Sequence, residues 1–325
     1  MKLFAAFLRL VRWPNLVFIV LTQLLFYYCI VTPALQPGAS NTLTPFLLGL
    51  LIGSSVLIAA AGYIINDYFD LNIDQVNKPE AIVINKIIRR RWAIIWHLSL
   101  SAIGVALAFY VGYKISNLLL GVLNLICVLL LWVYSTSLKK RLLMGNIVIS
   151  LLTAWVVLVI YFCEFNAVKW IAAANAGNTA EEAAKLAYQH YLQRLFRLAV
   201  IYSGFAFIIS LIREVVKDIE DMQGDAKYGC RTMPIVWGLP ASKMFVAVWL
   251  VVLILAIIII HVYGLMQFWW VAPVYGLVAI VGPLVYMLLQ FYKASTPAHY
   301  HRISQLIKLV MFTGILSMIF FKWHI

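Results

Sequence analysis

Aspartate residues recur with the same spacing in two distant parts of this 325-residue chain. In each part, three of them stand at positions i, i+3 and i+7: Asp67, Asp70 and Asp74 in the first, and Asp218, Asp221 and Asp225 in the second. At about 100° per residue, such a triplet falls within roughly 60° of one helix face. Each part is therefore predicted to be helical and to carry a row of carboxylates along one side.

The two rows hold most of the negative charge of the chain. Only 12 residues are acidic, and nine of them lie in the stretches 67–80 and 214–225. Carboxylates held so close repel one another, so a compensating cation is expected. Lysine pairing is one solution, but Mg²⁺ suits the pattern better, because this ion commonly binds through one or two carboxylates plus substrate phosphate oxygens. We therefore interpret all six aspartates as catalytic metal ligands whose facing rows hold Mg²⁺ and clamp a diphosphate.

Basic residues lie next to both rows. Lys78 follows the first row, Lys139 lies at the end of another apolar run, and the second row is bracketed by Arg213, Lys217 and Lys227. A phosphate oxygen that no metal ligates needs donors of this kind. These five residues are candidate substrate-binding residues, although a membrane orientation signal by itself would also place basic residues here.

The composition indicates which elements must position these residues. The chain is 64% hydrophobic and 11% charged, and several apolar runs approach the ~20 residues that a helix needs to cross a bilayer. Because the runs are continuous rather than alternating, helices are expected and barrel strands are not. The sequence excludes a soluble protein and predicts an all-α polytopic membrane protein with nine transmembrane helices, at 14–33, 44–66, 92–112, 117–134, 146–164, 197–217, 243–262, 267–290 and 304–322.

The distribution of Lys and Arg predicts the orientation of these helices. With nine spans and a cytoplasmic N-terminus, 19 of the 25 basic residues fall on the cytoplasmic side and six on the other. This excess is the usual topological signal, and it places both aspartate rows at a cytoplasmic mouth, in the plasma membrane if the source is prokaryotic. It also accounts for the net charge of +13, so membrane lipids are expected as partners and nucleic acid is not.

The segment 165–196, between the fifth and sixth spans, is less hydrophobic than the rest of the chain. Thr179, followed three residues later by Glu182, is typical of a capping box that opens a helix near residue 180. We expect an interfacial helix on the outer side of the membrane that leads into the sixth span.

The cysteine and histidine residues give no sign of further chemistry. Cys29, Cys127, Cys163 and Cys230 are scattered, which argues against a disulfide framework, a thiolate metal site or a redox motif. The six histidines show no metal-ligand spacing. Since no linker or low-complexity tract interrupts the chain, it is interpreted as one helical domain.

Four stretches resemble signatures of the UbiA-type membrane prenyltransferase superfamily. They are RWPN from Arg12 to Asn15, NDYFDLNIDQVNKP from Asn66 to Pro79, YSTSLKK from Tyr134 to Lys140, and REVVKDIEDMQGDAKYGCRTMPI from Arg213 to Ile235. The resemblance covers essentially the whole chain. It implies a single UbiA-type domain over residues 1–325, folded as a nine-helix bundle around a central cavity that binds Mg²⁺ and a prenyl diphosphate.

The resemblance also implies roles for individual residues. Both aspartate rows match the metal-binding motifs, and the matching substrate-binding positions are Asn15, Asn66, Tyr134, Ser135 and Lys139. The motif REVVKDIEDMQGD, with the later TMPI, is most similar to the sequences of the branch that makes archaeal-type ether lipids. This similarity implies transfer of a polyprenyl group to the hydroxyl of a prenylglyceryl phosphate. The chain departs from this branch after Pro79, where it reads EAIVINKIIRRR instead of an Arg-Pro-Leu-Pro-Ser-Gly-like run.

The chemistry that suits these residues is cleavage of an allylic carbon–oxygen bond by a prenyltransferase, an enzyme that transfers an alkyl group other than methyl. Negative charge builds on the departing diphosphate, where Mg²⁺ and the nearby cations stabilise it. Tyr63, Tyr68, Phe69 and Tyr134 are candidates for stabilising positive charge on the isoprenoid. Glu214 is a candidate general base, and the departing diphosphate is another.

Two other functions stay open at this stage. One is prenylation of an aromatic acceptor in quinone biosynthesis, which uses the same metal site. The other is a divalent-cation transporter, in which carboxylates line the ion path. Transport sites usually lie near the bilayer midplane on broken helices, whereas these acids lie at the ends of spans among Lys and Arg, which favours an anionic substrate.

Overall fold

The computed structural model describes residues 2–35, 42–80, 82–165, 179–266 and 270–323. This part of the chain is helical and contains no named strand, which confirms the predicted all-α class. The elements are α1 (Lys2–Leu10), α2 (Trp13–Phe26), η1 (Tyr27–Val31), α3 (Thr32–Ala34), α4 (Pro45–Asn77), α5 (Arg90–Lys114), α6 (Leu119–Thr136), η2 (Leu138–Lys140), α7 (Met144–Glu164), α9 (Thr179–Glu220), α10 (Met222–Lys227), α11 (Met233–Val236), α12 (Gly238–Met266), α13 (Val271–Gly276), η3 (Leu277–Val281), α14 (Gly282–Lys293), α15 (Pro297–Leu316) and η4 (Ser317–Trp323).

Nine helical stretches within the described residues are long and apolar enough to cross a membrane, which confirms the predicted number of spans. Most boundaries agree within a few residues. The sixth span begins at Leu186 instead of residue 197, and the second span also differs, because α4 continues from the predicted end at residue 66 to Asn77. Its polar last turns remain helical because they still bury apolar side chains, such as Leu71 and Ile73, against neighbouring elements. This extension keeps the first aspartate row on one unbroken helix.

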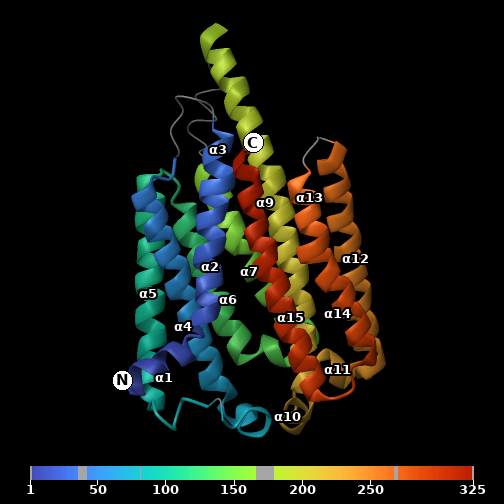
Figure 1. Cartoon of the computed structure of the whole chain (residues 1–325). Helices are drawn as coiled ribbons and strands as arrows, with labels where there is room; N and C mark the ends of the chain where they lie inside the picture. The colour runs from blue at the N-terminus through green and yellow to red at the C-terminus, as the bar shows by residue number, and fades with distance from the viewer. Residues whose placement is uncertain (1, 36–41, 81, 166–178, 267–269, 324–325) are drawn as a thin grey trace.

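The sixth span belongs to the longest helix, α9, which has 42 residues. A helix beginning near residue 180 is confirmed, since α9 begins at Thr179. It is not a separate interfacial helix, however, because it runs without a break into the sixth span, and Figure 1 shows its first turns projecting beyond the bundle. Residues 166–178 of the predicted interfacial segment lie outside the described residues.

Three clusters of buried apolar residues hold the described part of the bundle together, and α9 contributes to two of them. One includes Phe26 of α2, Leu48 of α4 and Leu195 of α9. The other packs Val216 of α9 against α12, α14 and α15, with residues such as Leu284. The two clusters use successive stretches of α9, residues 191–202 in the first and 209–219 in the second, so burial along its length anchors this helix in the bundle.

The loops that carry charged residues gather at one end of the bundle. In Figure 1, α1, α10, α11 and the segment after α4 all lie at the lower end, whereas α3 and α13 lie at the upper end. The acidic last turns of α4 and the end of α9 are therefore on the same side. This arrangement agrees with the prediction that the two aspartate rows lie at the same end of the bundle.

Candidate active site

A central cavity of about 630 Å³ opens between the helices, and all six aspartates of the two rows line it. Its walls come mainly from α2, α4, α6, α7, α9 and α15. Toward the mouth the lining is charged, while deeper positions are apolar or aromatic, including Phe18, Leu152 and Phe205. A polar mouth above an apolar interior suits a ligand with an anionic head and a hydrocarbon chain.

Each residue of the first row on α4 has a distinct environment. Asp67 forms an ion pair with Arg12 at 2.7 Å between carboxylate oxygen and guanidinium nitrogen. Asp70 accepts from Lys139 at 2.5 Å and from the amide of Asn66 at 2.8 Å. Among the described residues, no donor hydrogen-bonds to the carboxylate of Asp74. The first two members of this row are thus held by cations, and the third is left for another partner.

In the second row, too, the first two carboxylates have partners and, among the described residues, the third has none, although the partners differ. Asp218 accepts from the side-chain amide of Asn146 at 2.8 Å. Asp221 forms an ion pair with Lys78 at 2.8 Å. Asp225 has no side-chain partner in the part of the chain that the structure describes. The row also differs in its backbone from the expected single helix, because α9 ends at Glu220 and Asp221 precedes the short helix α10.

Direct contacts join the two acidic segments across the mouth. The side chain of Asn77, the last residue of α4, donates to the carbonyl of Asp221 at 3.1 Å and accepts from the backbone N–H of Gly224 at 2.9 Å. A Cβ atom at position 224 would lie only 2.2 Å from the Asn77 side-chain oxygen, so this close approach requires glycine. Burial opposes the charged form of Lys78, but Asp221 and Glu220 outweigh it and raise its pKa.

The two carboxylates without partners sit in a site that suits a hard divalent cation. Burial, and then the neighbouring charges of Asp221 and Asp70, raise the pKa of Asp225 to about 7. This shift reflects negative charge that is not fully compensated within the chain. No three His, Cys, Asp or Glu side chains in the described ranges converge closely enough to hold a metal by themselves. The donor set therefore fits Mg²⁺ bound by one or two carboxylates together with substrate phosphate oxygens, the usual mode for this ion.

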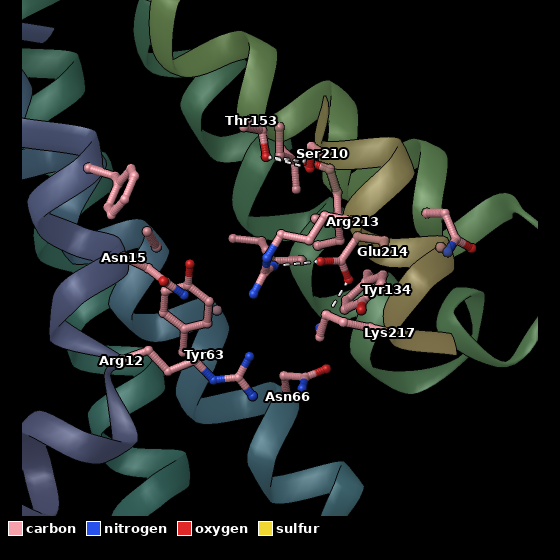
Figure 2. A pocket seen from close by; sticks show the side chains of 18 of the residues that line it. Arg12, Asn15, Tyr63, Asn66, Tyr134, Thr153, Ser210, Arg213, Glu214 and Lys217 are labelled. Carbon is pink, nitrogen blue, oxygen red and sulfur yellow. Dashed lines mark hydrogen bonds and ion pairs between the residues drawn. The ribbon is translucent and has the colours of Figure 1, made fainter. Parts of the chain in front are cut away.

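Cationic residues of α9 line the mouth beside the second row. Glu214 accepts from Arg213 at 3.0 Å and from Lys217 at 3.2 Å, and Figure 2 shows these three side chains together beside Tyr134. Across the open space in the same view lie Arg12, Asn15, Tyr63 and Asn66. Because Glu214 is held between two cations, it orients them toward the cavity and is poorly placed to act as a free base.

Arg12 is a site residue that the sequence analysis did not single out. It pairs with Asp67, and its guanidinium lies 5.1 Å from the centre of the Tyr63 ring. The charge of Asp67 raises the pKa of Arg12, so this residue remains cationic. Its backbone is left-handed, with φ of 51° before α2, and such conformations in residues other than glycine are uncommon and concentrate at functional sites.

The cavity contains most, but not all, of the predicted site residues. Besides the aspartates it is lined by Asn15, Asn66, Lys78, Tyr134, Lys139, Arg213 and Lys217. Ser135 lies outside it, because its side chain is turned by about 100° around α6 from that of Tyr134, which lines the cavity. The hydroxyl of Ser135 donates instead to the carbonyl of Leu131 at 2.8 Å. Lys227 is exposed on α10 and also lies outside the cavity. The structure thus places these two candidates outside the cavity, and a contact with substrate stays a prediction for both.

Two of the four candidate aromatic residues are also placed elsewhere. Tyr63 and Tyr134 line the cavity. The ring of Tyr68 is covered instead by the guanidinium of Arg90 at 4.6 Å, and Phe69 packs edge to face against Trp132 at 6.1 Å. Tyr68 and Phe69 therefore cannot stabilise charge on a substrate inside the cavity, because their positions on α4 face away from it.

Asn146, Arg9 and Lys308 are further cavity residues that the sequence analysis missed. Asn146 and Lys308 did give a signal, because each is a polar residue near or within an apolar run, in MGNIVIS and QLIKLV. Polar residues inside spans usually face the bundle interior and have a functional partner. Arg9 gave no such signal, since it lies in the short N-terminal segment outside the spans.

Comparisons with known proteins identify the family. The UbiA prenyltransferase family model matches residues 24–312. A digeranylgeranylglyceryl phosphate synthase from Methanothermobacter thermautotrophicus is 29% identical over 268 residues, which cover 82% of each chain. A solved structure described as digeranylgeranylglyceryl phosphate synthase superposes with a TM-score of 0.63 at 20% identity, covering 98% of this chain and 99% of that one. The structure of a UbiA homolog from Archaeoglobus fulgidus, solved with DMAPP and Mg²⁺, superposes with a TM-score of 0.54 at 14% identity. The superposition covers 96% of this chain and 98% of that one.

This chain belongs to the UbiA prenyltransferase family. It is accordingly a prenyltransferase and an integral membrane protein with several spans. The family match confirms the resemblance that the four sequence signatures indicated, and the nine-helix bundle around a cavity agrees with it.

Proposed function

We propose that this protein transfers a polyprenyl group from an allylic prenyl diphosphate to the hydroxyl of a prenylglyceryl phosphate, in a reaction that requires Mg²⁺. The observation that carries the proposal is the meeting of two carboxylate rows at one mouth of a cavity whose interior is apolar. The named relatives support this acceptor, because they are digeranylgeranylglyceryl phosphate synthases. The solved relative with DMAPP and Mg²⁺ supports the donor class and the metal.

The donor binds with its diphosphate at the mouth and its hydrocarbon chain in the apolar interior. Bound Mg²⁺ supplies charge neutralisation for the diphosphate, with Asp74 and Asp225 as the carboxylates free to ligate it and the remaining aspartates in support. Lys139 and Lys78 lie beside the two rows, where their ammonium groups donate to phosphate oxygens. Together these groups stabilise the charge that develops when the leaving group departs.

The transfer breaks the bond between the first isoprenoid carbon and the diphosphate oxygen. The acceptor hydroxyl oxygen then forms the new ether bond to that carbon, and its proton passes to the departing diphosphate. Tyr63 and Tyr134 line the cavity on facing walls, where their rings stabilise positive charge on the allylic carbon. The surrounding helices exclude water, which would otherwise capture the cation.

The proposal includes the placement of the protein in the membrane. With the N-terminus and the active-site mouth in the cytoplasm, 19 of 25 basic residues lie on the cytoplasmic side. A single domain over residues 1–325 is also proposed, and it is supported by a cavity lined from residues as far apart as Arg9 and Met318.

An acceptor screen tests this function. Detergent-solubilised protein is given geranylgeranyl diphosphate and Mg²⁺ with either geranylgeranylglyceryl phosphate or a 4-hydroxybenzoate-type or naphthoate-type aromatic acid. Ether product and diphosphate release are expected only with the glyceryl phosphate, and only when Mg²⁺ is present. Product from the aromatic acids alone would assign the protein to quinone biosynthesis, and diphosphate release from neither would contradict the transferase.

A further inference from the structure

A second cavity of about 620 Å³ adjoins the first on the side of the N-terminal helix. It is lined by residues of α1, the start of α2, and α15, together with the ends of α4 and α9. Its basic residues are Arg9, Arg12, Lys78, Arg213, Lys217 and Lys308, and all six also line the first cavity. The two cavities therefore adjoin across these shared side chains, and the second is a basic annex to the site already described.

The charge of this annex is only partly compensated by the chain. Four of its cations have carboxylate partners: Arg12 with Asp67, Lys78 with Asp221 and with Glu220, which also lines the annex, and both Arg213 and Lys217 with Glu214. Arg9 and Lys308 have no acidic partner among the described residues. In addition, the Nε–H of Arg213 is buried without an acceptor. A half-buried lysine within a span and a buried guanidinium N–H are costly when unpaired and mark binding sites for anions, while the exposed Arg9 of α1 adds positive charge at the edge of the annex.

The donor diphosphate does not account for these unpaired cations. Its place is beside the aspartate rows, where Lys139 and Lys78 already lie against Asp70 and Asp221. Lys308 instead belongs to α15, a helix that carries none of the aspartates, and Arg9 belongs to α1. A phosphate monoester carries about −1.5 to −2 charges at neutral pH, which complements two unpaired cations and a free guanidinium N–H.

We propose that the phosphate of the acceptor lipid binds in this annex, held by Lys308, Arg9 and the free N–H of Arg213. This inference rests on the proposed function and extends it by assigning the acceptor subsite. Because Arg9, Arg213 and Lys308 line both cavities, a phosphate held by them lies at the border of the main cavity, where the glycerol hydroxyl can extend toward the allylic carbon. The two anionic heads then occupy separate basic sites, which keeps donor and acceptor from exchanging places.

The rim of the annex suits a lipid acceptor. Leu8 and Trp13 line it, and Trp13 is 53% exposed at the start of the first span. Leu3 and Phe4 of α1 are also exposed, as expected for a short helix that rests at the membrane interface. A headgroup in the annex therefore lies beside an apolar surface that can accommodate its hydrocarbon chain.

Steady-state kinetics with Lys308→Gln test the subsite. The KM for geranylgeranylglyceryl phosphate is expected to rise about tenfold or more, because one charge-assisted contact to phosphate is lost, while the KM for geranylgeranyl diphosphate stays within about twofold. Arg9→Gln is expected to act in the same direction, and Lys308→Arg to retain most of the affinity. Arg302→Gln is the matched control, since Arg302 lies on the same helix, is exposed and lines neither cavity.

A phosphate-free acceptor and a binding measurement separate the possible outcomes. With geranylgeranylglycerol, Lys308→Gln is expected to cause no further loss relative to the unchanged protein. An equal rise in both KM values, or no rise for the acceptor, overturns the inference. If no turnover occurs with the glyceryl phosphate, the proposed function fails. The subsite is then tested by thermal unfolding with geranylgeranylglyceryl phosphate and no donor. The lipid must stabilise the unchanged protein and the Arg302→Gln variant, and it must not stabilise Lys308→Gln.

Discussion

The two aspartate rows have identical spacing but different surroundings. The first lies on the unbroken helix α4 and is held by the cations of Arg12 and Lys139. The second crosses the junction between α9 and α10, and its first member is held by the neutral amide of Asn146. In both rows the carboxylate of the third aspartate has no hydrogen-bond or ion-pair partner among the described residues. Equal spacing thus defines the ligands, while the tertiary partners decide which carboxylates remain available.

The largest effects are expected from removing one carboxylate from either row. Asp67→Ala and Asp221→Ala should each reduce turnover by at least about 10²-fold, the loss that follows when a preorganised electrostatic contact is removed at a site of developing charge. Membrane insertion and the amount of folded protein should stay unchanged. Product formation by purified variants measures this. A near-normal rate in only one of them would show that the two rows are not equivalent.

The unpartnered members of the rows provide the next test. Asp74→Asn and Asp225→Asn should each raise the Mg²⁺ concentration for half-maximal rate by at least about tenfold, because a ligand that no chain cation neutralises is lost. Titration of activity with Mg²⁺ measures the change. If excess Mg²⁺ fails to restore any rate in either variant, these residues serve something other than metal affinity.

The partners of the rows allow a direct comparison of a cation with an amide. Lys139→Met should raise the KM for the prenyl diphosphate about tenfold, since it removes a charged donor next to Asp70. Asn146→Ala should change this KM by about threefold or less, because it only frees the carboxylate of Asp218 to rotate. Initial rates over a range of donor concentrations distinguish the two. Equal effects would mean that the chemical nature of the partner is unimportant.

The contact between Asn77 and Gly224, which joins the two acidic segments, can be tested with a pair of substitutions. Gly224→Ala places a Cβ against the Asn77 side chain and should destabilise the protein by about 1–3 kcal/mol, the usual cost of overpacking. Replacing Asn77 with alanine in the same chain removes the clash, so the double variant should recover part of the loss. Thermal unfolding of the four proteins gives the coupling. Additive losses would place the strain elsewhere.

The smallest effects are expected from the two residues that the structure places outside the cavity. Lys227→Gln and Ser135→Ala should leave kcat and both KM values within about twofold, because neither side chain can touch a ligand there. The same kinetic assay measures both variants. A large loss for Lys227→Gln would mean that the mouth closes over α10 when substrate binds.

The sequence was sufficient to predict features that depend on neighbours along the chain. The apolar runs predicted nine spans, because the number of residues needed to cross a bilayer is set by helix rise and membrane thickness. The spacing of Asp67, Asp70 and Asp74 predicted one row on one helix face, because helix geometry is local. Hydropathy placed the end of the second span at residue 66, and the aspartate spacing predicted helix as far as Asp74, but only the packing shows that one unbroken helix runs from Pro45 to Asn77.

Only the tertiary structure decided which groups meet across the bundle. Nothing in the local sequence pairs Arg12 with Asp67 or Asn146 with Asp218, since these partners lie 55 and 72 residues apart. Likewise, Ser135 and Tyr134 are adjacent in the chain, yet one faces a carbonyl and the other the cavity. The types and spacing of residues determine the available chemistry, whereas the packing of helices determines which charges are paired, because electrostatic contacts depend on distance in space.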